Sequence, residues 1–314
     1  MQVLVTGAAG FIGSHLSEAL LRRGDRVVGL DAFIDYYPAS VKRANLEVAV
    51  ADPGFRLVEE DLRTGDLDAV VEGCDAVVHA AAMPGLPRSW TDFELYSSCN
   101  ISGTQRLAEA ARGAGVSKFV HISTSSVYGL DALGDETMPV RPVSPYGVTK
   151  LAAENLLWAF HEMFDLPVSV VRFFSVYGPR QRPDMAWHKF IDAIAADRTI
   201  QVFGDGEQSR SSTYVDDAVQ GTIGALDRAE VGETYNIGGG EVVTVLEAID
   251  LIGRALGRTP RLEYGPVRPG DQRATRADTT KAQAHFGYEA LVGPREGFAR
   301  QIAWQTGTDV PTPS

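Results

Sequence analysis

The sequence predicts an α/β protein built on a doubly wound parallel sheet, with a smaller, loop-rich C-terminal lobe. Short apolar runs alternate with amphipathic helical stretches in the first half of the chain, which is typical of strand–helix–strand units. The apolar runs lie at residues 3–5, 26–30, 56–58, 76–78, 119–122 and 168–173. The helical stretches include residues 11–22, 100–114 and 146–164.

The composition of the chain changes near Tyr177, after which glycine and proline become frequent. Helical patterns continue at residues 187–195, 215–227 and 245–256. We therefore expect residues 1–176 to form mainly the first domain and residues 177–314 mainly the second lobe, with some chain crossing between them. Residues 306–314 are polar and proline-rich, so we expect them to fray.

Composition and charge narrow the class of protein. With 44% hydrophobic residues the 314-residue chain can bury a sizeable core, and its net charge of −12 argues against a nucleic-acid partner. Cys74 and Cys99 lie outside any C-x-x-C motif or Cys/His cluster, so we expect no metal site and a reducing compartment. We also expect no signal peptide, no transmembrane helix and no membrane partner, which favours a cytoplasmic protein.

A glycine-rich loop follows the first predicted strand and opens the first predicted helix. Gly7, Gly10 and Gly13 have the spacing G-x-x-G-x-x-G. Glycine permits the tight turn and lets the backbone approach a pyrophosphate, while the N–H groups of the helix start at Phe11 and Ile12 attract the anion. The loop therefore predicts a Rossmann-type dinucleotide site.

Residues after the next strands complete the predicted cofactor site. Asp31 ends the second strand, where an acid would bind ribose hydroxyls and repel a 2′-phosphate, which favours NAD over NADP. Asp61 and Leu62 follow the third strand and are expected beside the adenine. Ala80 and Ala81 follow the fourth strand at the same edge of the sheet.

Tyr146 and Lys150 form a candidate proton-transfer pair. Their i, i+4 spacing places them on one face of a helix, one turn apart. An ammonium that close should lower the pKa of the phenol, giving a phenolate able to accept a proton from a hydroxyl group. His79, at the end of the fourth strand, is expected to be a packed histidine near the cofactor and not a catalytic base.

These motifs resemble those of the extended short-chain dehydrogenase/reductases. The glycine loop, the run Ser-Thr-Ser-Ser-Val-Tyr-Gly at residues 123–129 and the Tyr146/Lys150 pair occur in the family's order, and the resemblance covers nearly the whole chain. It implies an NAD-dependent enzyme acting on a nucleotide sugar, with Thr124 as the hydroxyl of the catalytic triad. A non-enzymatic NAD sensor on the same fold is disfavoured because Tyr146 and Lys150 are both intact.

The residues that follow Thr124 bear on the type of reaction. Similar 4,6-dehydratases carry an acid pair there, and similar decarboxylases carry a glutamate at the position of Ser126. This chain has Ser125 and Ser126, with no acid. The resemblance therefore implies a 4-epimerase that works through a 4-keto intermediate.

Residues 175–186 resemble the corresponding stretch of UDP-glucuronate 4-epimerases. Arg182 could pair with a sugar carboxylate, and Ser175 leaves room for it and can donate a hydrogen bond. With Thr124, Ser125 and Ser126 they would hold the carboxylate so that the β-keto acid does not lose carbon dioxide. We expect interconversion of UDP-glucuronate and UDP-galacturonate; a UDP-glucose or UDP-N-acetylglucosamine 4-epimerase is the alternative, and a UDP-glucuronate decarboxylase is third.

The same resemblance implies nucleotide contacts and an assembly. Phe203 would flank the uracil, two arginines would neutralise the diphosphate, and an aspartate would bind ribose hydroxyls. The implied contacts are Lys189, Val202, Phe203, Gln208, Arg210, Arg268 and Asp271. The chain departs from similar enzymes at residues 85–89, where the arginine is displaced by one position, and at residues 210–214, which read Arg-Ser-Ser-Thr-Tyr instead of Arg-Asp-Phe-Thr-Tyr.

A homodimer is also implied, because in similar enzymes the helices that correspond to residues 100–114 and to the helix beginning near Tyr146 pair across a two-fold axis. We expect each of these two helices to have an apolar outer face.

Overall fold

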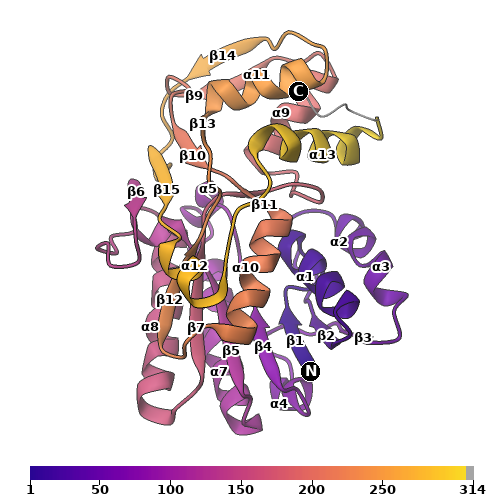
Figure 1. Cartoon of the computed structure of the whole chain (residues 1–314), viewed down its shortest axis with the longest axis vertical. Helices are drawn as coiled ribbons and strands as arrows, with labels where there is room; N and C mark the ends of the chain where they lie inside the picture. Colours follow the sequence, from indigo (N-terminus) through magenta and orange to yellow (C-terminus); the bar gives the residue numbers. More distant parts are fainter. Residues whose placement is uncertain (309–314) are drawn as a thin grey trace.

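The computed structural model describes residues 1–308 and contains a parallel sheet of seven strands (Figure 1). The strand order is β12-β7-β5-β4-β1-β2-β3, so the order reverses between β1 and β4 and the doubly wound sheet is confirmed. Six strands lie where the sequence predicts them, and β12 was not predicted. The strands are β1 (Gln2–Thr6), β2 (Arg26–Leu30), β3 (Phe55–Val58), β4 (Ala76–His79), β5 (Lys118–Thr124), β7 (Val168–Phe173) and β12 (Glu233–Ile237).

Helices cover both faces of this sheet because its strands are apolar on both sides. In β1 the side chains of Val3 and Val5 belong to one buried cluster and that of Leu4 to another. The first face packs against α1 (Phe11–Arg22) and α10 (Val215–Arg228), and the second against α4 (Leu67–Val71), α7 (Gly103–Ala114) and α8 (Pro145–Phe164). The shorter α2 (Ala39–Asn45) and α3 (Glu47–Val50) contact α1, and α12 (Thr280–Phe286) contacts α10.

The second lobe holds the remaining strands and three further helices (Figure 1). Its largest sheet has the order β13-β10-β15-β6, and β9 pairs in parallel with β14. The helices are α9 (Ala186–Ala195), α11 (Val245–Ala255) and α13 (Pro294–Thr306). The strands are β6 (Asp131–Gly134), β9 (Ile200–Phe203), β10 (Ser209–Ser211), β13 (Val242–Thr244), β14 (Leu262–Gly265) and β15 (Ala274–Ala277).

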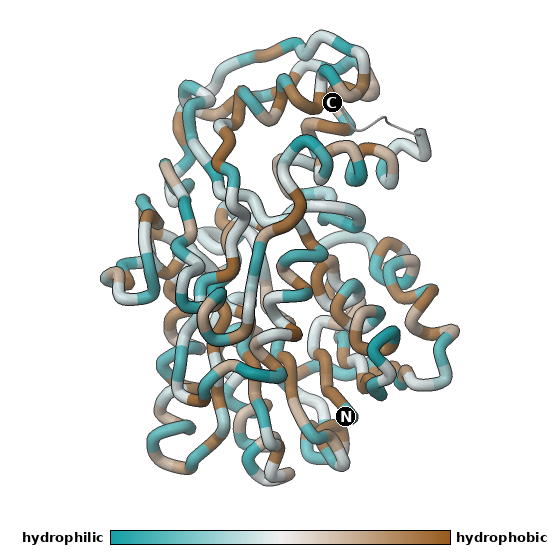
Figure 2. The backbone as a smooth tube through the Cα atoms, viewed as in Figure 1, coloured by the Kyte–Doolittle hydropathy of each residue, from teal (hydrophilic) through white to brown (hydrophobic). Residues whose placement is uncertain are grey.

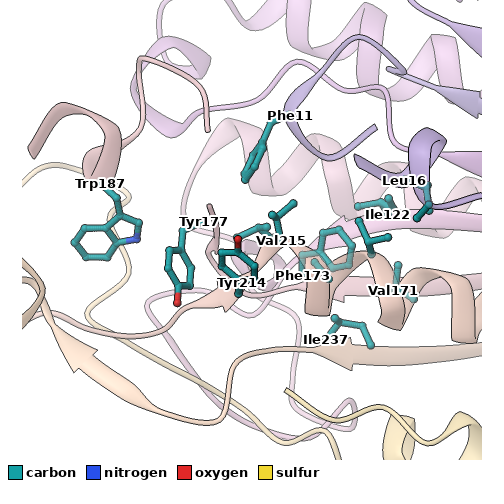
Figure 3. Packing of buried hydrophobic residues seen from close by; sticks show 14 of the residues in the cluster. Phe11, Leu16, Ile122, Val171, Phe173, Tyr177, Trp187, Tyr214, Val215 and Ile237 are labelled. Atoms are coloured by element: carbon teal, nitrogen blue, oxygen red, sulfur yellow. The ribbon is translucent and has the colours of Figure 1, made fainter. Parts of the chain in front are cut away.

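One buried cluster joins the two lobes. β8 (Val176–Tyr177) pairs with β11 (Thr213–Tyr214) at the junction, and Figure 3 shows Trp187, Tyr177 and Val215 in a row that continues to the sheet. The rings of Tyr177 and Trp187 also pack on Phe298 of α13, with ring centroids 5.0 and 5.6 Å apart. In Figure 2 the surface helices alternate between teal and brown, as expected for helices with one buried face.

The predicted helix at residues 100–114 begins earlier than expected. It follows α5 (Leu86–Ser89) and consists of α6 (Phe93–Ser97), a π-helical turn η1 (Ser98–Ser102) and α7. The turn contains Asn100, which accepts a hydrogen bond from the backbone N–H of Met83 at 2.7 Å and donates to Thr149 Oγ1 at 3.0 Å. Asn100 thereby ties the loop after β4 to the helix that carries Tyr146 and Lys150.

The chain returns to the large sheet after residue 176, since α10 and β12 both pack there. We propose a lobe boundary near residue 177 with crossings in both directions. α10, β12 and α12 pack with the first lobe, and β6 pairs in the sheet of the second. The predicted frayed tail lies partly outside the described residues: α13 includes Thr306, and residues 309–314 are not described. Within residues 1–308, none of the helices has both the length and the apolar character needed to cross a membrane.

Candidate active site

A cavity of about 650 Å³ lies at the carboxyl edge of the large sheet, where six of its strands end. Ligand sites of doubly wound sheets lie at this edge because the loops after the strands diverge where the strand order reverses. All the residues expected to bind the cofactor line the cavity: Gly7, Gly10, Phe11, Ile12, Gly13, Asp31, Asp61, Leu62, Ala80, Ala81, Tyr146 and Lys150.

Most of the residues expected to bind substrate line the same cavity. They are Thr124, Ser125, Ser126, Ser175, Arg182, Lys189, Arg210, Arg268 and Asp271. An adjoining cavity of about 700 Å³ shares several of these and adds Phe203 and Gln208. Val202 lines neither cavity: its side chain is 1% exposed and packs in the hydrophobic core, so the expected side-chain contact was wrong.

The glycine loop is shaped so that side chains could not be added to it. Gly7 has a φ of 70°, and a Cβ there would lie 2.9 Å from the backbone of Ala81. A Cβ on Gly13 would lie 2.1 Å from the carbonyl oxygen of Gly7, so the start of α1 sits directly against the loop. The backbone is therefore open to an approaching pyrophosphate at the N-terminus of α1.

Asp31 is held in place at the end of β2. Its carboxylate accepts hydrogen bonds from the backbone N–H groups of Ala9 at 3.1 Å and Phe33 at 2.8 Å, and Lys42 Nζ lies 3.5 Å away. A carboxylate has about four acceptor positions, so acceptor capacity remains for two ribose hydroxyls. The residues of this cradle fit NAD, and sequence analysis did not identify Lys42.

Tyr146 and Lys150 lie on the first turns of α8, as predicted. Ser144 caps this helix through a bond from the Gly147 N–H at 3.1 Å. Lys150 Nζ donates to the carbonyl oxygen of Ile122 at 2.8 Å, which joins α8 to β5. The Thr124 hydroxyl accepts from the N–H of Ser126 at 3.2 Å, so it also caps the turn η2 (Ser125–Val127).

Burial shifts the pKa values of both groups of this pair. It raises the pKa of Tyr146, and the hydrogen bond with Thr124 and the charge of Arg182 offset this only in part. Burial also lowers the pKa of Lys150 to about 8, against the opposing effect of Glu154. The predicted phenolate also depends on the positive charge of a bound nicotinamide, so it stays a prediction for the NAD-loaded site.

Two neutral histidines lie behind Lys150. His79 is fully buried and its ring nitrogens contact Thr6 Oγ1 at 2.7 Å and Thr104 Oγ1 at 2.9 Å. Burial and then the charge of Lys150 lower the pKa of His79 to about 3, so it stays uncharged. His79 is thus the packed histidine that the sequence predicted, and His121 Nε2 lies 3.3 Å from Lys150 Nζ.

A buried ion pair fixes α8 to the sheet. Glu154, one turn after Lys150, accepts hydrogen bonds from Arg172 of β7, the shorter at 2.6 Å, and from the hydroxyl of Ser123 at 2.5 Å. Arg172 also donates to the Tyr128 hydroxyl at 2.9 Å. Because both charges are satisfied by hydrogen bonds, the pair sets the position of the helix without leaving an unpaired buried charge.

The wall expected to hold the sugar contains hydroxyl groups and one arginine. Ser125, Ser126 and Ser175 line it, and Ser175 has a left-handed backbone with a φ of 32°, which is strained for serine. Arg182 is paired with Asp184 through two hydrogen bonds, from Nε at 2.9 Å and from Nη2 at 3.1 Å. The arginine is therefore already neutralised before any substrate carboxylate arrives.

The residues expected to bind the nucleotide lie where the two cavities meet. The Arg268 guanidinium lies 3.3 Å from the centroid of the Phe203 ring, and Arg210 Nη1 donates to the Ser209 carbonyl at 2.8 Å. Burial lowers the pKa of Arg210, and the opposing charge of Asp271 offsets this in part. These four residues thus place two cations and one carboxylate between the sugar end and the base end of the combined cavity.

Several residues that line the cavity were not identified from the sequence. Tyr36, Lys42 and Gln272 belong to no recognisable motif. Asp184 lies in the 175–186 stretch, but the sequence predicted no role for it. The displaced Arg88 lines the cavity, is paired with Asp92 at 2.9 Å and has its guanidinium 5.3 Å from the centroid of the Tyr36 ring. No local pattern could have indicated these residues, because tertiary packing brings them to the cavity.

The buried ammonium of Lys150 should cost stability. Its pKa is about 8 in the folded protein against an ordinary value of 10.5, so the cost is complete below pH 8 and vanishes as the pH rises to 10.5. At pH 7 the buried charge should lower the free energy of unfolding by about 3 kcal/mol. Replacing Lys150 also removes its hydrogen bond to Ile122, which is worth about 1 kcal/mol, so the gain in stability is smaller by that amount. We expect Lys150→Met to raise the free energy of unfolding at neutral pH, measured by urea denaturation, with a gain that shrinks toward pH 10. A loss of stability at pH 7 would contradict this.

The pairing of Asp31 with Lys42 predicts the effect of removing the carboxylate. Asp31→Ala should weaken NAD binding by about 10–150-fold, the range for hydrogen bonds to a charged group. The same change frees Lys42 to meet a 2′-phosphate, so NADP binding should fall less or improve. Titration calorimetry with both nucleotides measures this. The control is Asp31→Ala/Lys42→Met, in which the gain of NADP affinity relative to NAD affinity should be lost. A wild-type preference for NADP would contradict the assignment.

Comparisons with known proteins agree with this geometry. The chain is 42% identical to the uncharacterised UDP-glucose epimerase YtcB of Bacillus subtilis over 97% of this chain and 98% of the relative. It is 37% identical to the UDP-glucuronate 4-epimerase of Thermodesulfobacterium geofontis, covering 96% and 95%. The crystal structure of UDP-glucuronic acid 4-epimerase from Bacillus cereus with UDP-glucuronic acid and NAD superposes with a TM-score of 0.96 at 41% identity, covering 98% and 99%.

Residues 3–238 match the model of the NAD dependent epimerase/dehydratase family, which is consistent with the glycine loop, the Tyr146/Lys150 pair and the fold. The chain therefore belongs to the NAD-dependent epimerase/dehydratase family.

Proposed function

We propose that this enzyme is an NAD-dependent UDP-sugar 4-epimerase that interconverts UDP-glucuronate and UDP-galacturonate. The observation that carries the proposal is one cavity in which Tyr146 and Lys150 share a wall with hydroxyl groups and Arg182. The relatives named as UDP-glucuronate 4-epimerases, and the similar Bacillus cereus structure that contains UDP-glucuronic acid, support the uronate as substrate.

Tyr146 is placed to move the proton of the sugar 4-hydroxyl. Thr124 hydrogen-bonds to it, and the positive charge of Arg182 opposes the rise of its pKa. NAD, when bound, would accept the hydride from carbon 4, and the reduced cofactor would return it to the opposite face of carbon 4 after the 4-keto sugar has turned over in the site. Tyr146 then gives the proton back, so the reaction needs no exchange of protons with water and no net change of cofactor.

The hydroxyl groups and Arg182 that line the cavity would control the keto acid formed midway. A ketone at carbon 4 makes the uronate a β-keto acid, which loses carbon dioxide when the bond to the carboxylate is aligned with the ketone. Ser125, Ser126, Ser175 and Arg182 would hold the carboxylate out of that alignment. Since Nε and Nη2 of Arg182 bind Asp184, the guanidinium has a fixed plane to present to the substrate.

The similarity to an uncharacterised UDP-glucose epimerase keeps a neutral hexose as the second candidate. Direct product analysis distinguishes the candidates. Purified enzyme should convert UDP-glucuronate to UDP-galacturonate and leave UDP-glucose and UDP-N-acetylglucosamine largely unchanged, with chromatography and NMR as readouts. Preferential conversion of a neutral sugar would reject the uronate, and UDP-pentose with carbon dioxide as main products would indicate a decarboxylase.

Of the two helices expected to form the dimer interface, α8 has an apolar outer face and α7 does not. On α8 the outward side chains include Val148, Ala159 and Met163, of which Met163 is 72% exposed. On α7 the outward residues Glu109 and Arg112 are charged, so the predicted apolar outer face of that helix was wrong. We propose a homodimer in which α8 supplies the apolar part of the interface.

Charge introduced on α8 should therefore dissociate the protein. We expect wild type to have the mass of a dimer by light scattering and Ala159→Glu to have that of a monomer, because a buried unpaired carboxylate is costly. Val48→Glu is the matched control, since Val48 is 60% exposed on α3. A monomeric wild-type protein at micromolar concentration would count against the dimer.

We propose a cytoplasmic location for the enzyme. Cys74 and Cys99 are both buried and unpaired, which suits a reducing compartment.

The role of Arg182 can be tested through substrate choice. Arg182→Leu should impair UDP-glucuronate by about 10–150-fold more than UDP-glucose, since a neutral sugar offers no charge to the guanidinium. The keto acid would also be held less firmly, so UDP-4-keto-pentose and carbon dioxide should appear. Product analysis on both substrates measures the two effects, and Tyr146→Phe is the inactive reference.

A second variant removes an ambiguity in this test. Arg182→Leu leaves Asp184 without its cationic partner, although the Tyr36 hydroxyl still donates to it at 3.2 Å, and its charge would itself repel a carboxylate. Arg182→Leu/Asp184→Asn lacks that repulsion, so it should remain defective on UDP-glucuronate if Arg182 binds the carboxylate directly. Recovery of the double variant, or equal losses on both sugars without carbon dioxide, would contradict the assigned role.

A further inference from the structure

Gln272 links two parts of the cavity that belong to different lobes. Its side chain is 8% exposed and lies at the end of the loop that carries Arg268 and Asp271. Its carboxamide nitrogen donates to the carbonyl oxygens of Ser125 at 3.1 Å and Gly129 at 2.8 Å. Its carboxamide oxygen accepts from the Ser125 hydroxyl at 3.2 Å.

All the hydrogen-bonding groups of the Gln272 side chain thus point at the turn that follows Thr124. An amide nitrogen with two donors matches two carbonyl oxygens, and the amide oxygen matches the hydroxyl. The Ser125 carbonyl also accepts from the backbone N–H of Tyr128 at 3.1 Å, but neither a carboxylate nor an apolar side chain could replace the two hydrogen bonds that Gln272 donates. The fit is specific to a carboxamide of this length.

The backbone of the same segment is held by Arg210, a residue expected to contact the nucleotide. Arg210 donates to the carbonyl oxygens of both Gln272 and Arg273. A continuous set of hydrogen bonds therefore runs from Arg210, which faces the expected diphosphate, through Gln272 to Ser125, which faces the expected sugar.

The loop also touches the catalytic helix. Gly270 has a φ of 85°, and a Cβ there would lie 3.3 Å from Cβ of Ser144, the residue that caps α8. Residues 268–272 therefore lie against both the N-terminus of α8 and the turn after β5. A displacement of this loop would therefore shift both the N-terminus of α8 and the turn after β5.

We propose that Gln272 is a positioning residue through which binding of the nucleotide sets the position of the Ser125–Ser126 turn, and so of the sugar carboxylate. The proposal rests on the proposed function and adds a residue to it. Binding of the diphosphate and ribose by Arg210, Arg268 and Asp271 fixes the position of the loop. Through its hydrogen bonds Gln272 then fixes the position of the Ser125–Ser126 turn. Nucleotide-binding energy is then used to orient the reacting part of the substrate.

Gln272→Leu removes all three hydrogen bonds while keeping a similar volume. Each neutral hydrogen bond contributes about 2- to 12-fold, so the loss of all three should lower kcat on UDP-glucuronate by at least about 10-fold. The dissociation constant of UDP alone should change by no more than about twofold, as for a change without effect on binding. The fraction of substrate converted to UDP-4-keto-pentose and carbon dioxide should rise.

Gln283→Leu is the matched control, because Gln283 is exposed on α12 and lines neither cavity. It should leave kcat, UDP binding and product composition unchanged. NAD content and the thermal midpoint of both variants show whether each is folded. Parallel losses of NAD, UDP affinity and kcat in Gln272→Leu would mean a general structural role and overturn the proposal.

Gln272→Glu gives a readout that does not depend on folding alone. As a carboxylic acid the new side chain donates one hydrogen bond, and as a carboxylate it donates none. The ratio of its kcat to that of wild type should therefore fall as the pH rises through the ionisation of a buried carboxyl group. Tyr146, Lys150, Arg182, Arg210, Arg268 and Asp271 line the same cavity in both proteins, so the pH dependence that is common to both is removed by the ratio. A ratio independent of pH would overturn the proposal.

The outcome remains distinguishable if the uronate is not the substrate. Should wild type epimerise UDP-glucose instead, the proposed function fails, but the kcat and UDP measurements can be made with that sugar. A fall in kcat at constant UDP affinity would still support the role of Gln272, and unchanged kcat would reject it.

Discussion

The active site depends on one geometric constraint: parallel strands all present their carboxyl ends at the same edge of a sheet. Because β1 to β5 and β7 end there, residues separated by more than a hundred positions share one cavity. The glycine loop and Asp31 come directly after strands, Thr124 ends β5, and Ser175 lies between β7 and β8. Tyr146 and Lys150 come from α8, and the buried pair Glu154–Arg172 fixes that helix to the sheet.

Burial has opposite effects on the two groups that move the proton. It makes Tyr146 a weaker acid and Lys150 a weaker base, so neither is charged as freely as it would be in water. The neutral histidines behind Lys150 add no charge. Of the arginines that line the cavity, Arg182 is paired with Asp184, Arg88 with Asp92 and Arg210 with backbone carbonyls, and the Arg268 guanidinium lies over the Phe203 ring.

Sequence reasoning was most successful where function requires a fixed local pattern. The spacing of Gly7, Gly10 and Gly13 and of Tyr146 and Lys150 is set by one turn and one helix, so six strands and the central motifs could be predicted. Gln272 and Lys42 could not, because their roles come from contacts between segments far apart in the chain. β12 was missed because five residues of mixed polarity carry little periodicity. Val202 was expected at the substrate because a resemblance gives the position of a residue but not the direction of its side chain.

The strand β12 has a consequence for how the protein is made. It covers the outer edge of β7, yet it follows a long excursion through the second lobe. During synthesis the apolar strand β7 emerges first and keeps an open row of backbone hydrogen-bonding groups until β12 arrives, which is a template for aggregation. The first lobe cannot complete its sheet from its own continuous segment, so a chain cut near residue 177 would expose that edge permanently. The large sheet can therefore be completed only after the chain has been made as far as Ile237, through α9, β9 and β10 of the second lobe.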